Sequence, residues 1–373
     1  MQIAPFATEQ FYALYEFNTP HLLSVSDCET VTVERLLALA GASLADLGRL
    51  GLGYTESQGD PELRSLIAAD YDSVAAESVV VLTSPIEGIY LTMRTLLEPG
   101  DEAIILTPAY DALKNVAAHI CGSVVEWPLQ ATATGWQLDL IALEALVTPQ
   151  TKLLVVNFPH NPTGFLPTLD DAEAIIALAA RHNLWLFSDE MYRGLELGDR
   201  QPLPSLAERY ERSIVLSGLS KAYGLPGLRA GWLLVPDTTI RQQLINWKYY
   251  TTICPAAPTE FLAKAALQAK ESLLARSQET IAANLALADA FFARWPQHFI
   301  WRRPQAGSVA LVGLGVGLKV ASATRYCHQL AQMAGVLLLP GTCLGYDDAH
   351  VRFGFGRQSF AEALAHYETQ LTL

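Results

Sequence analysis

Short runs of Val, Ile and Leu recur between residues 79 and 235, and amphipathic stretches separate them. Most runs lack alternation of polar and apolar residues, which is typical of strands covered on both faces of a largely parallel sheet. We therefore predict strands at Val79–Leu82, Glu102–Leu106, Ser123–Trp127, Lys152–Phe158, Leu184–Phe187, Ile214–Ser217 and Gly231–Val235. The repeated order of strand and helix indicates an α/β domain with a mostly parallel seven-stranded sheet flanked by helices.

Helical patterns fill the spaces between these strands. The clearest covers Asp170–His182, because Thr168 precedes it and Asp171 follows three residues later, as in a capping box. Beyond Pro255 the chain becomes rich in Ala, Leu and Gln, which predicts one long helix over about residues 259–295.

This change of composition near residue 255 predicts a division into two domains. With 373 residues, the chain is longer than a single hydrophobic core usually grows. We expect a large domain at 46–255, and a smaller α+β domain made of 1–45 together with 256–373. Two such lobes leave a cleft between them.

Composition and charge exclude several classes of partner. Apolar residues make up 51% of the chain and charged residues 17%, which is typical of a globular protein. The net charge of −13 argues against nucleic acid and anionic membranes as partners. The five cysteines are odd in number and contain no Cys-x-x-Cys pair, so we expect no metal site, no disulfide framework and a cytoplasmic location.

Three polar clusters follow three of the predicted strands. They are Asn157–Gly164, Ser188–Glu190 and Ser217–Lys221. In open α/β sheets, ligands bind in the crevice beyond the carboxyl ends of the strands, so these clusters are expected to converge.

Lys221 and Asp189 carry the candidate chemistry. A lysine in a covered crevice loses hydration, its pKa falls, and it can attack a carbonyl to give a Schiff base, although a solvated surface lysine is the alternative. The Asp189 carboxylate ends an apolar strand and needs a cationic partner, such as a protonated pyridine nitrogen. The alternative is a helix cap or a metal ligand.

Arg229 and Arg352 lie in apolar surroundings, where a guanidinium usually binds a phosphate or carboxylate, or forms a structural ion pair. The Gly-rich stretch Gly313–Gly317 is not a dinucleotide-binding fingerprint, because Leu318 stands where its third glycine belongs.

Several short motifs occur in a fixed order between about residues 51 and 357. They are Tyr54 with Gly59-x-x-Glu62-Leu63-Arg64, Asn161-Pro162-Thr163-Gly164, Asp189-Glu190-x-Tyr192, Ser220-Lys221 with Arg229, and Val351-Arg352. In this order they resemble the class I/II aminotransferases, the fold type I enzymes related to aspartate aminotransferase that depend on pyridoxal 5′-phosphate (PLP).

The resemblance implies a role for each matching residue around the cofactor ring. Lys221 matches the Schiff-base lysine that also moves the α-proton, and Asp189 matches the carboxylate that keeps the pyridine nitrogen protonated. Asn161 and Tyr192 match the pair that hydrogen-bonds the ring 3-oxygen. Tyr110 matches the aromatic residue that stacks on the ring.

The resemblance also implies how the phosphate and the substrate are held. The phosphate is expected at the N-terminus of a helix that begins near Ile86, with Arg229 as a clamp. Tyr54 matches a tyrosine that reaches the phosphate from the neighbouring subunit, which implies a homodimer with shared active sites. Arg352 matches the arginine that binds the substrate α-carboxylate, and Asn161 lies with it at the substrate.

Two positions depart from the family pattern. Pro85 lies in the phosphate turn and has no N–H to donate, so Ser84, Ile86 and Glu87 are expected to supply more of the contacts. The serine usually found three residues before the lysine is Gly218, and either Ser217 or Ser220 is expected to replace it.

We therefore predict an aminotransferase that acts on an α-amino acid and a 2-oxo acid. A PLP-dependent lyase or cyclase of the same fold is the alternative, because these reactions share the carbanion at the α-carbon. A non-catalytic module that senses amino acids is a third interpretation. The sequence leaves the substrate open, with Phe17–Pro20 and Trp247–Tyr250 as candidate pocket segments.

Overall fold

The computed structural model describes residues 3–371, and its centre is a seven-stranded sheet. In spatial order the strands are β2 (Val79–Leu82), β10 (Gly231–Leu234), β9 (Ser213–Gly218), β8 (Trp185–Asp189), β7 (Thr151–Asn157), β3 (Glu102–Thr107) and β4 (Ser123–Pro128). Only β10 runs antiparallel to its neighbours in this sheet. The predicted fold class is confirmed, and each predicted strand end lies within two residues of its observed position.

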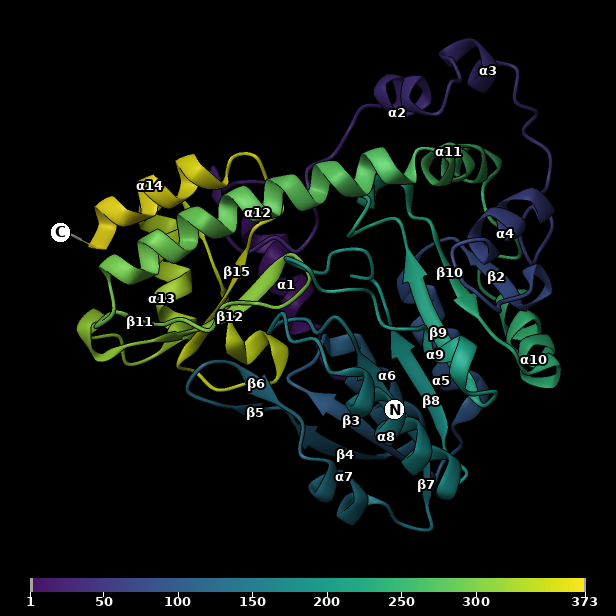
Figure 1. Cartoon of the computed structure of the whole chain (residues 1–373), viewed down its shortest axis with the longest axis horizontal. Coiled ribbons are helices and arrows are strands. Elements are labelled where there is room, and N and C mark those ends of the chain that lie inside the picture. The colour runs from purple at the N-terminus through teal and green to yellow at the C-terminus, as the bar shows by residue number, and fades with distance from the viewer. Residues whose placement is uncertain (1–2, 372–373) are drawn as a thin grey trace.

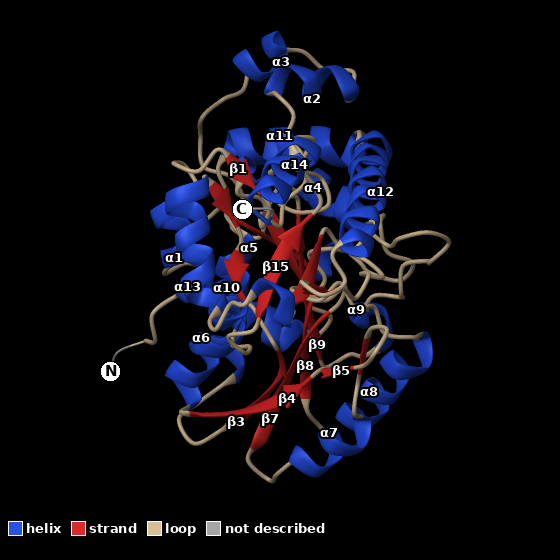
Figure 2. Cartoon of the chain, turned by 90° about the vertical axis from the view of Figure 1, so that its left-hand side faces the viewer, coloured by secondary structure: helices blue, strands red, loops and turns tan. Residues whose placement is uncertain are grey.

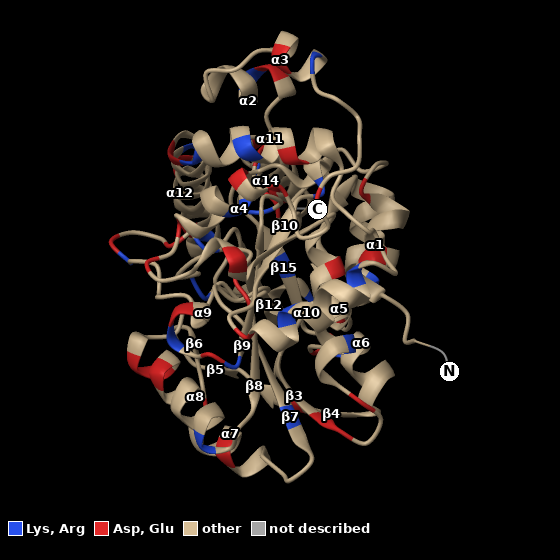
Figure 3. Cartoon of the chain, turned by 90° about the vertical axis from the view of Figure 1, so that its right-hand side faces the viewer, with Lys and Arg blue, Asp and Glu red and all other residues tan. Residues whose placement is uncertain are grey.

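Helices cover both faces of this sheet, as Figures 2 and 3 show from opposite sides. One face carries α5 (Pro85–Leu96), α6 (Asp111–Cys121) and α10 (Thr238–Lys248), and the other carries α7 (Leu140–Leu146), α8 (Leu169–Arg181) and α9 (Leu206–Arg209). The predicted capping box of α8 is confirmed, since Thr168 and Asp171 exchange hydrogen bonds between side chain and backbone. α5 approaches the sheet closely at Gly88, where a Cβ atom would lie 2.7 Å from Leu82 Cδ1.

A smaller antiparallel sheet lies beside the main one (Figure 1). Its order is β11 (Phe299–Ile300), β12 (Val309–Leu314), β15 (His350–Gly354) and β14 (Leu339–Pro340). The N-terminal region joins this part of the chain, because β1 (His21–Leu22) pairs with β13 (Val336–Leu337). The two sheets fall within the predicted ranges 46–255 and 256–373, while the domain division itself stays a prediction.

The remaining elements connect or flank these sheets. The α-helices and strands are α1 (Ala7–Tyr15), α2 (Val33–Leu39), α3 (Leu44–Gly48), α4 (Pro61–Ala68), α13 (Ala323–Gln329), α14 (Phe360–Leu371), β5 (Gln130–Ala131) and β6 (Trp136–Gln137). Short 3₁₀ turns cover Ala76–Ser78, Pro226–Leu228, Val316–Leu318 and Gly341–Leu344, and a π turn covers Leu330–Ala334.

The prediction of one helix over 259–295 is wrong. The chain forms α11 (Ala257–Gln268) and α12 (Lys270–Arg294), with a break at Ala269, where ψ is 13°. Ala269 is buried, and the next side chain, Lys270, pairs with the Asp70 carboxylate. Tertiary packing therefore places the break, and the Ala-rich pattern contains no local stop signal for it.

Within residues 3–371, no helix is both long enough and apolar enough to cross a membrane. The same residues contain no cluster of three or more metal-ligating His, Cys, Asp or Glu side chains. Figure 3 shows basic and acidic residues spread over many elements, without a basic face in that view.

Candidate active site

The polar clusters converge at the carboxyl ends of β7, β8 and β9. These strands are parallel neighbours, so the residues that follow them reach the same edge of the sheet. Asn161, Tyr192 and Lys221 lie on the loops after the three strands. Arg352 on β15 closes the site from the smaller sheet, where its Nη1 donates to Asn161 Oδ1 at 3.1 Å.

The amine of Lys221 is held in a polar but sheltered position. Its Nζ donates to Ser26 Oγ at 2.9 Å. Burial lowers the pKa of Lys221, the Arg352 charge lowers it further, and the carboxylates of Asp27 and Asp189 act in the opposite sense. The neutral, nucleophilic form of the amine is therefore more accessible than in a solvated lysine.

The Asp189 side chain is 8% exposed, and it accepts a hydrogen bond from the Met191 N–H at 3.1 Å. Burial raises the pKa of Asp189 to about 6, while the Met191 N–H and the charge of Lys221 oppose the rise. Among the described residues, no Lys, Arg or His comes within ion-pair distance of this carboxylate. A buried carboxylate in this state favours a cation beside it.

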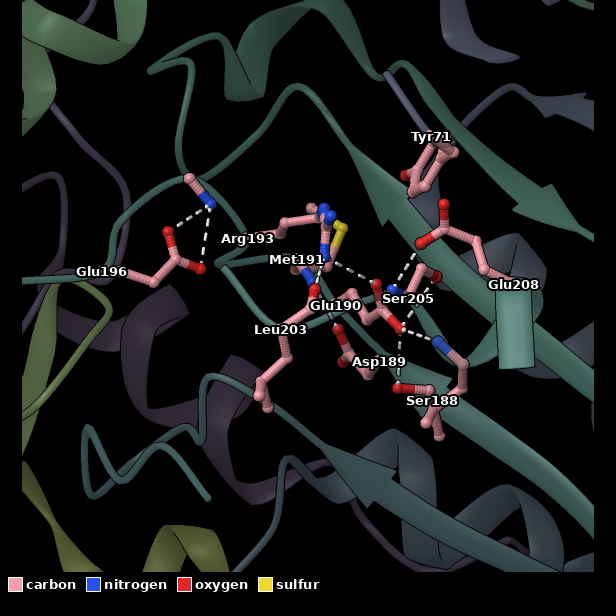
Figure 4. A network of polar contacts seen from close by, with 12 residues as sticks. Tyr71, Ser188, Asp189, Glu190, Met191, Arg193, Glu196, Leu203, Ser205 and Glu208 are labelled. Atoms are coloured by element: carbon pink, nitrogen blue, oxygen red, sulfur yellow. Dashed lines mark hydrogen bonds and ion pairs between the residues drawn. The ribbon is translucent and has the colours of Figure 1, made fainter. Parts of the chain in front are cut away.

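The neighbouring Glu190 is held in a network of hydrogen bonds within the chain, as Figure 4 shows. Its Oε1 accepts hydrogen bonds from the hydroxyls of Ser188 and Ser205 at 3.2 and 3.1 Å and from the Leu206 N–H at 3.1 Å. This network ties β8 to the start of α9, so Glu190 stabilises the framework behind Asp189.

Tyr192 and Asn161 lie on the loops that follow β8 and β7. Tyr192 is 3% exposed, and its hydroxyl has no hydrogen-bond partner within residues 3–371. Burial raises the pKa of Tyr192, so the hydroxyl stays protonated and remains a donor. The Asn161 backbone N–H donates to Asn157 Oδ1 at 2.7 Å, which fixes this loop.

Arg352 is a buried cation surrounded by neutral partners. It is 2% exposed, and it donates to Tyr12 Oη at 2.7 Å, to the Ser24 carbonyl at 2.9 Å and to Asn161. No described carboxylate lies within ion-pair distance of its guanidinium. A buried guanidinium without a counter-ion is suited to a ligand carboxylate.

The start of α5 provides few donors for a phosphate. Ser84 is the N-cap residue, and its side chain makes no capping hydrogen bond. Pro85 occupies the first helical position and is buried, while Ile86 is partly exposed. The backbone N–H groups of Ser84 and Ile86 are the ones left to face an anion at this helix terminus.

Glu87 is engaged within the chain. Its carboxylate accepts from the Thr83 N–H at 3.0 Å and from the hydroxyls of Thr251 and Thr252 at 2.6 and 2.7 Å. Its N–H donates to the Ser84 carbonyl at 3.0 Å. The predicted contact from Glu87 to a phosphate stays a prediction.

The other predicted phosphate ligands differ in exposure, direction and hydrogen bonding. Arg229 is exposed and donates to the Pro226 carbonyl of its own turn at 2.8 Å. Ser217 precedes Gly218 on β9, so its side chain points to the opposite face of the sheet from position 218. Ser220 is buried, and its hydroxyl has no partner among the described residues, which favours it over Ser217 as the replacement.

Two predicted aromatic ligands have contrasting environments. Tyr110 donates its hydroxyl to Glu9 Oε1 at 2.7 Å, and its ring lies 5.1 Å from that of Phe6. Tyr54 is 93% exposed, and its contact with another subunit stays a prediction. Of the candidate pocket segments, Phe17 is exposed, and Trp247 packs under the Arg94 guanidinium at 4.8 Å.

Sequence reasoning missed the segment of residues 24–27 that lies beside Lys221 and Arg352. Its backbone passes so close to Gly354 and Gly356 that added Cβ atoms would lie 1.8 Å from the Val25 carbonyl oxygen and 2.4 Å from that of Asp27. The two glycines that follow Arg352 in sequence were the available signal.

Residues 22–366 match the family described as Aminotransferase class I and II. The chain belongs to this family. The PLP dependence of the family makes pyridoxal 5′-phosphate the expected cofactor of this enzyme. The predicted resemblance is confirmed, and the alternative of a non-catalytic module loses its basis.

Named relatives of this class I/II enzyme include proteins with different activities. Capreomycidine synthase of Streptomyces vinaceus is 30% identical over 89% of this chain and 84% of its own length. Arginine–pyruvate transaminase AruH of Pseudomonas aeruginosa is 30% identical over 92% of this chain and 87% of its own length. The solved structure of the PLP-dependent cyclase OrfR superposes with a TM-score of 0.90 at 26% identity, and covers 100% of this chain and 98% of that one.

The residues of the site fit PLP. Asp189 is a buried carboxylate that favours a cation, which the protonated ring nitrogen supplies. The unpartnered Tyr192 hydroxyl suits the ring 3-oxygen, and the sheltered amine of Lys221 suits the aldehyde. The ring nitrogen, the 3-oxygen and the aldehyde of the cofactor thus each have a counterpart in this aminotransferase-family chain.

Proposed function

We propose that this enzyme is an aminotransferase that moves the amino group of an α-amino acid to a 2-oxo acid, with Lys221 attaching the cofactor. The supporting observation is that one segment holds both groups: the Lys221 amine donates to Ser26 Oγ at 2.9 Å, and the Arg352 guanidinium donates to the Ser24 carbonyl at 2.9 Å. An amino acid has two groups to anchor, and these two residues offer a nucleophilic amine and a carboxylate-binding fork.

Each residue has a separable task in the proposed reaction. Arg352 binds the α-carboxylate and holds the α-carbon beside Lys221, and the bound cofactor supplies a ring that withdraws electrons from that carbon. Once the substrate amine has displaced it from the cofactor, Lys221 Nζ would take the α-proton and return it at a neighbouring atom, because its lowered pKa leaves the freed amine available in the neutral form. Asp189 keeps a negative charge beside the ring nitrogen throughout.

The proposal includes a homodimer with shared active sites. Tyr54, Leu52 and Tyr250 are large hydrophobic side chains that this chain leaves exposed. Exposed apolar side chains of this size commonly mark an interface, and a second copy of the chain is the partner that the family resemblance implies.

A PLP-dependent cyclase or lyase is the second candidate function. It is favoured by the likeness to capreomycidine synthase and to the cyclase OrfR, at identities similar to that of the transaminase relative. Such enzymes begin with the same loss of a bond at the α-carbon, so the residues above serve both reactions.

The deciding experiment uses purified protein saturated with PLP. An aminotransferase converts an amino donor and a 2-oxo acid into a new amino acid and a new 2-oxo acid in equal amounts. A lyase releases ammonia or a side-chain fragment, and a cyclase changes the amino acid without any 2-oxo acid. Lys221→Ala must abolish turnover, and retention of turnover in that variant refutes the proposal.

A further inference from the structure

We infer that Glu9 and Glu16 select amino acids whose side chain ends in a cation, so that the substrate is a basic amino acid. This inference rests on the proposed function and specifies its substrate class. It is argued from two observations: one side of α1 faces Arg352, and the two glutamates on that side form no ion pair with any described residue.

One side of α1 faces Arg352. Glu9, Tyr12 and Glu16 are spaced at i, i+3 and i+7, so they project from one side of the helix and its C-cap. Tyr12 is buried, and its hydroxyl accepts a hydrogen bond from Arg352 Nη2 at 2.7 Å. The contact between Tyr12 and the proposed α-carboxylate ligand turns this side of α1 toward the substrate.

The carboxylates of Glu9 and Glu16 lie near the active-site residues. Glu9 accepts a hydrogen bond from the Tyr110 hydroxyl at 2.7 Å, which places it next to the predicted ring-stacking residue. The charges of both Glu9 and Glu16 act on Lys221. Both glutamates therefore lie within electrostatic range of the reacting amine.

Three carboxylates near Lys221 differ in whether their charge is balanced by an ion pair. A third acid, Asp27, is already neutralised by an ion pair with Arg357 at 2.6 Å. Glu9 and Glu16 form no ion pair with any described Lys, Arg or His, and α1 contains no basic residue. Burial and repulsion by the other two acids raise the pKa of Glu16, while Arg357 and Lys221 oppose the rise. A cation that enters here relieves this repulsion.

The acidic pair does not define the site by itself. The buried Arg352 guanidinium has no carboxylate within ion-pair distance and the buried Tyr192 hydroxyl has no hydrogen-bond partner among the described residues, and both lie near Tyr12 of α1, so they point to a ligand on this side of the helix. A basic amino acid matches all of these groups, since its α-carboxylate meets Arg352 and its distal cation meets the glutamates. Two carboxylates also suit the fork of a guanidinium better than the point charge of an ammonium.

The test compares substrates of nearly equal shape that differ in charge. The cofactor-loaded enzyme is assayed with arginine against citrulline and with lysine against norleucine, all with the same 2-oxo acid. We expect kcat/KM for arginine to exceed that for citrulline by at least about tenfold, because citrulline cannot form the charge-assisted contact to the glutamates. The preference should decrease with added salt.

Variants assign this preference to the acidic pair. In Glu16→Gln the arginine-to-citrulline ratio should fall by about tenfold, and in Glu9→Gln, which is exposed and bonded to Tyr110, by less. Glu271→Gln removes the same charge from an exposed position in the first turn of α12 and should leave the ratio unchanged. A wild-type ratio near one, or a ratio that both active-site variants leave intact, overturns the inference.

A binding measurement separates this inference from the proposed function. Calorimetry with the PLP-loaded Lys221→Ala variant reports arginine and citrulline binding without turnover. Turnover of neutral amino acids without preference for basic ones refutes the inference alone. Absence of turnover with every amino acid refutes the aminotransferase proposal, and tighter binding of arginine than citrulline still supports the acidic pair in that case.

Discussion

The ring of Pro85 fills the space that a side chain at position 218 would need. A Cβ atom on Gly218 would lie 3.0 Å from Pro85 Cγ, and one on the paired Gly231 would lie 2.8 Å from the same atom. The two departures from the family pattern are thus one packing arrangement. The Pro85 ring and the backbone of Ala230 and Gly231 together leave no room for a side chain at position 218, where the family usually has a serine.

This arrangement predicts coupling between positions 85 and 218. Gly218→Ser should destabilise the protein by about 1–3 kcal/mol, because the added atoms meet the Pro85 ring and the Ala230 carbonyl. Adding Pro85→Ala should recover part of this loss and strengthen PLP binding relative to the single variant. Urea unfolding and a cofactor titration measure both effects.

Gly227→Ser is the matched control for this pair, because nothing lies within 4 Å of a Cβ atom at that position. Its free energy of unfolding should change by no more than about 0.5 kcal/mol. Strict additivity of Gly218→Ser and Pro85→Ala would contradict the coupling.

Asp189 should make the cofactor-free protein less stable at neutral pH. Its pKa is about 6 in the folded protein, compared with about 3.9 in an unfolded chain. The folded state binds more protons between these values, so stability falls as pH rises from about 4 to about 6. Asp189→Asn should therefore raise the unfolding free energy at pH 8 by up to about 3 kcal/mol, with little effect near pH 4.

Thermal unfolding at the two pH values, with and without PLP, checks this prediction. With PLP the order should reverse at pH 8, because asparagine cannot balance a charged ring nitrogen. An equal gain at both pH values would show that the carboxylate charge is not the cause.

The main sheet was predictable because the residues of each strand are themselves enough to indicate a strand. Runs such as Val79–Leu82 are apolar at every position, and burial on both faces follows from that composition. The break at Ala269 was not predictable, since Ala is an excellent helix former and only the packing around Lys270 reveals the end of α11.

The candidate site likewise contains residues that the sequence predicts and residues that only the structure reveals. Lys221 and Asp189 follow predicted strands, so their position was accessible from the sequence. Ser26 and Glu16 were not, because their approach to Lys221 depends on contacts between segments nearly 200 residues or more apart, which no local pattern encodes. The glutamates of α1 look like ordinary helix-surface residues until Tyr12 is seen to contact Arg352.

Replacement of Arg352 by lysine should affect substrate binding more than cofactor binding. Lysine keeps the charge but cannot donate to Tyr12, Ser24 and Asn161 in a planar fork while also meeting a carboxylate. We expect KM for the amino donor to rise by about a hundredfold, equivalent to about 3 kcal/mol. The visible band of the bound cofactor without substrate should change little.

Steady-state kinetics and an absorption spectrum of the same preparation measure the two effects. Arg294→Lys, at an exposed ion pair with Glu368 on the surface, serves as the control and should leave KM unchanged. Equal losses of cofactor and substrate binding in Arg352→Lys would assign Arg352 to the framework instead.

Tyr54 provides a test of shared active sites, because its side chain is 93% exposed in the single chain. If it completes the site of a neighbouring subunit, the Lys221→Ala and Tyr54→Ala proteins should complement each other after mixing under conditions that exchange subunits. Each hybrid dimer then has one site with both substitutions and one native site, so activity should rise toward about a quarter of the wild-type value. Mixing Lys221→Ala with Asp189→Asn is the control, since one chain supplies both of these residues and every hybrid site stays defective. Activity equal to the mean of the two separate Lys221→Ala and Tyr54→Ala proteins would mean that Tyr54 does not complete the site of a neighbouring subunit.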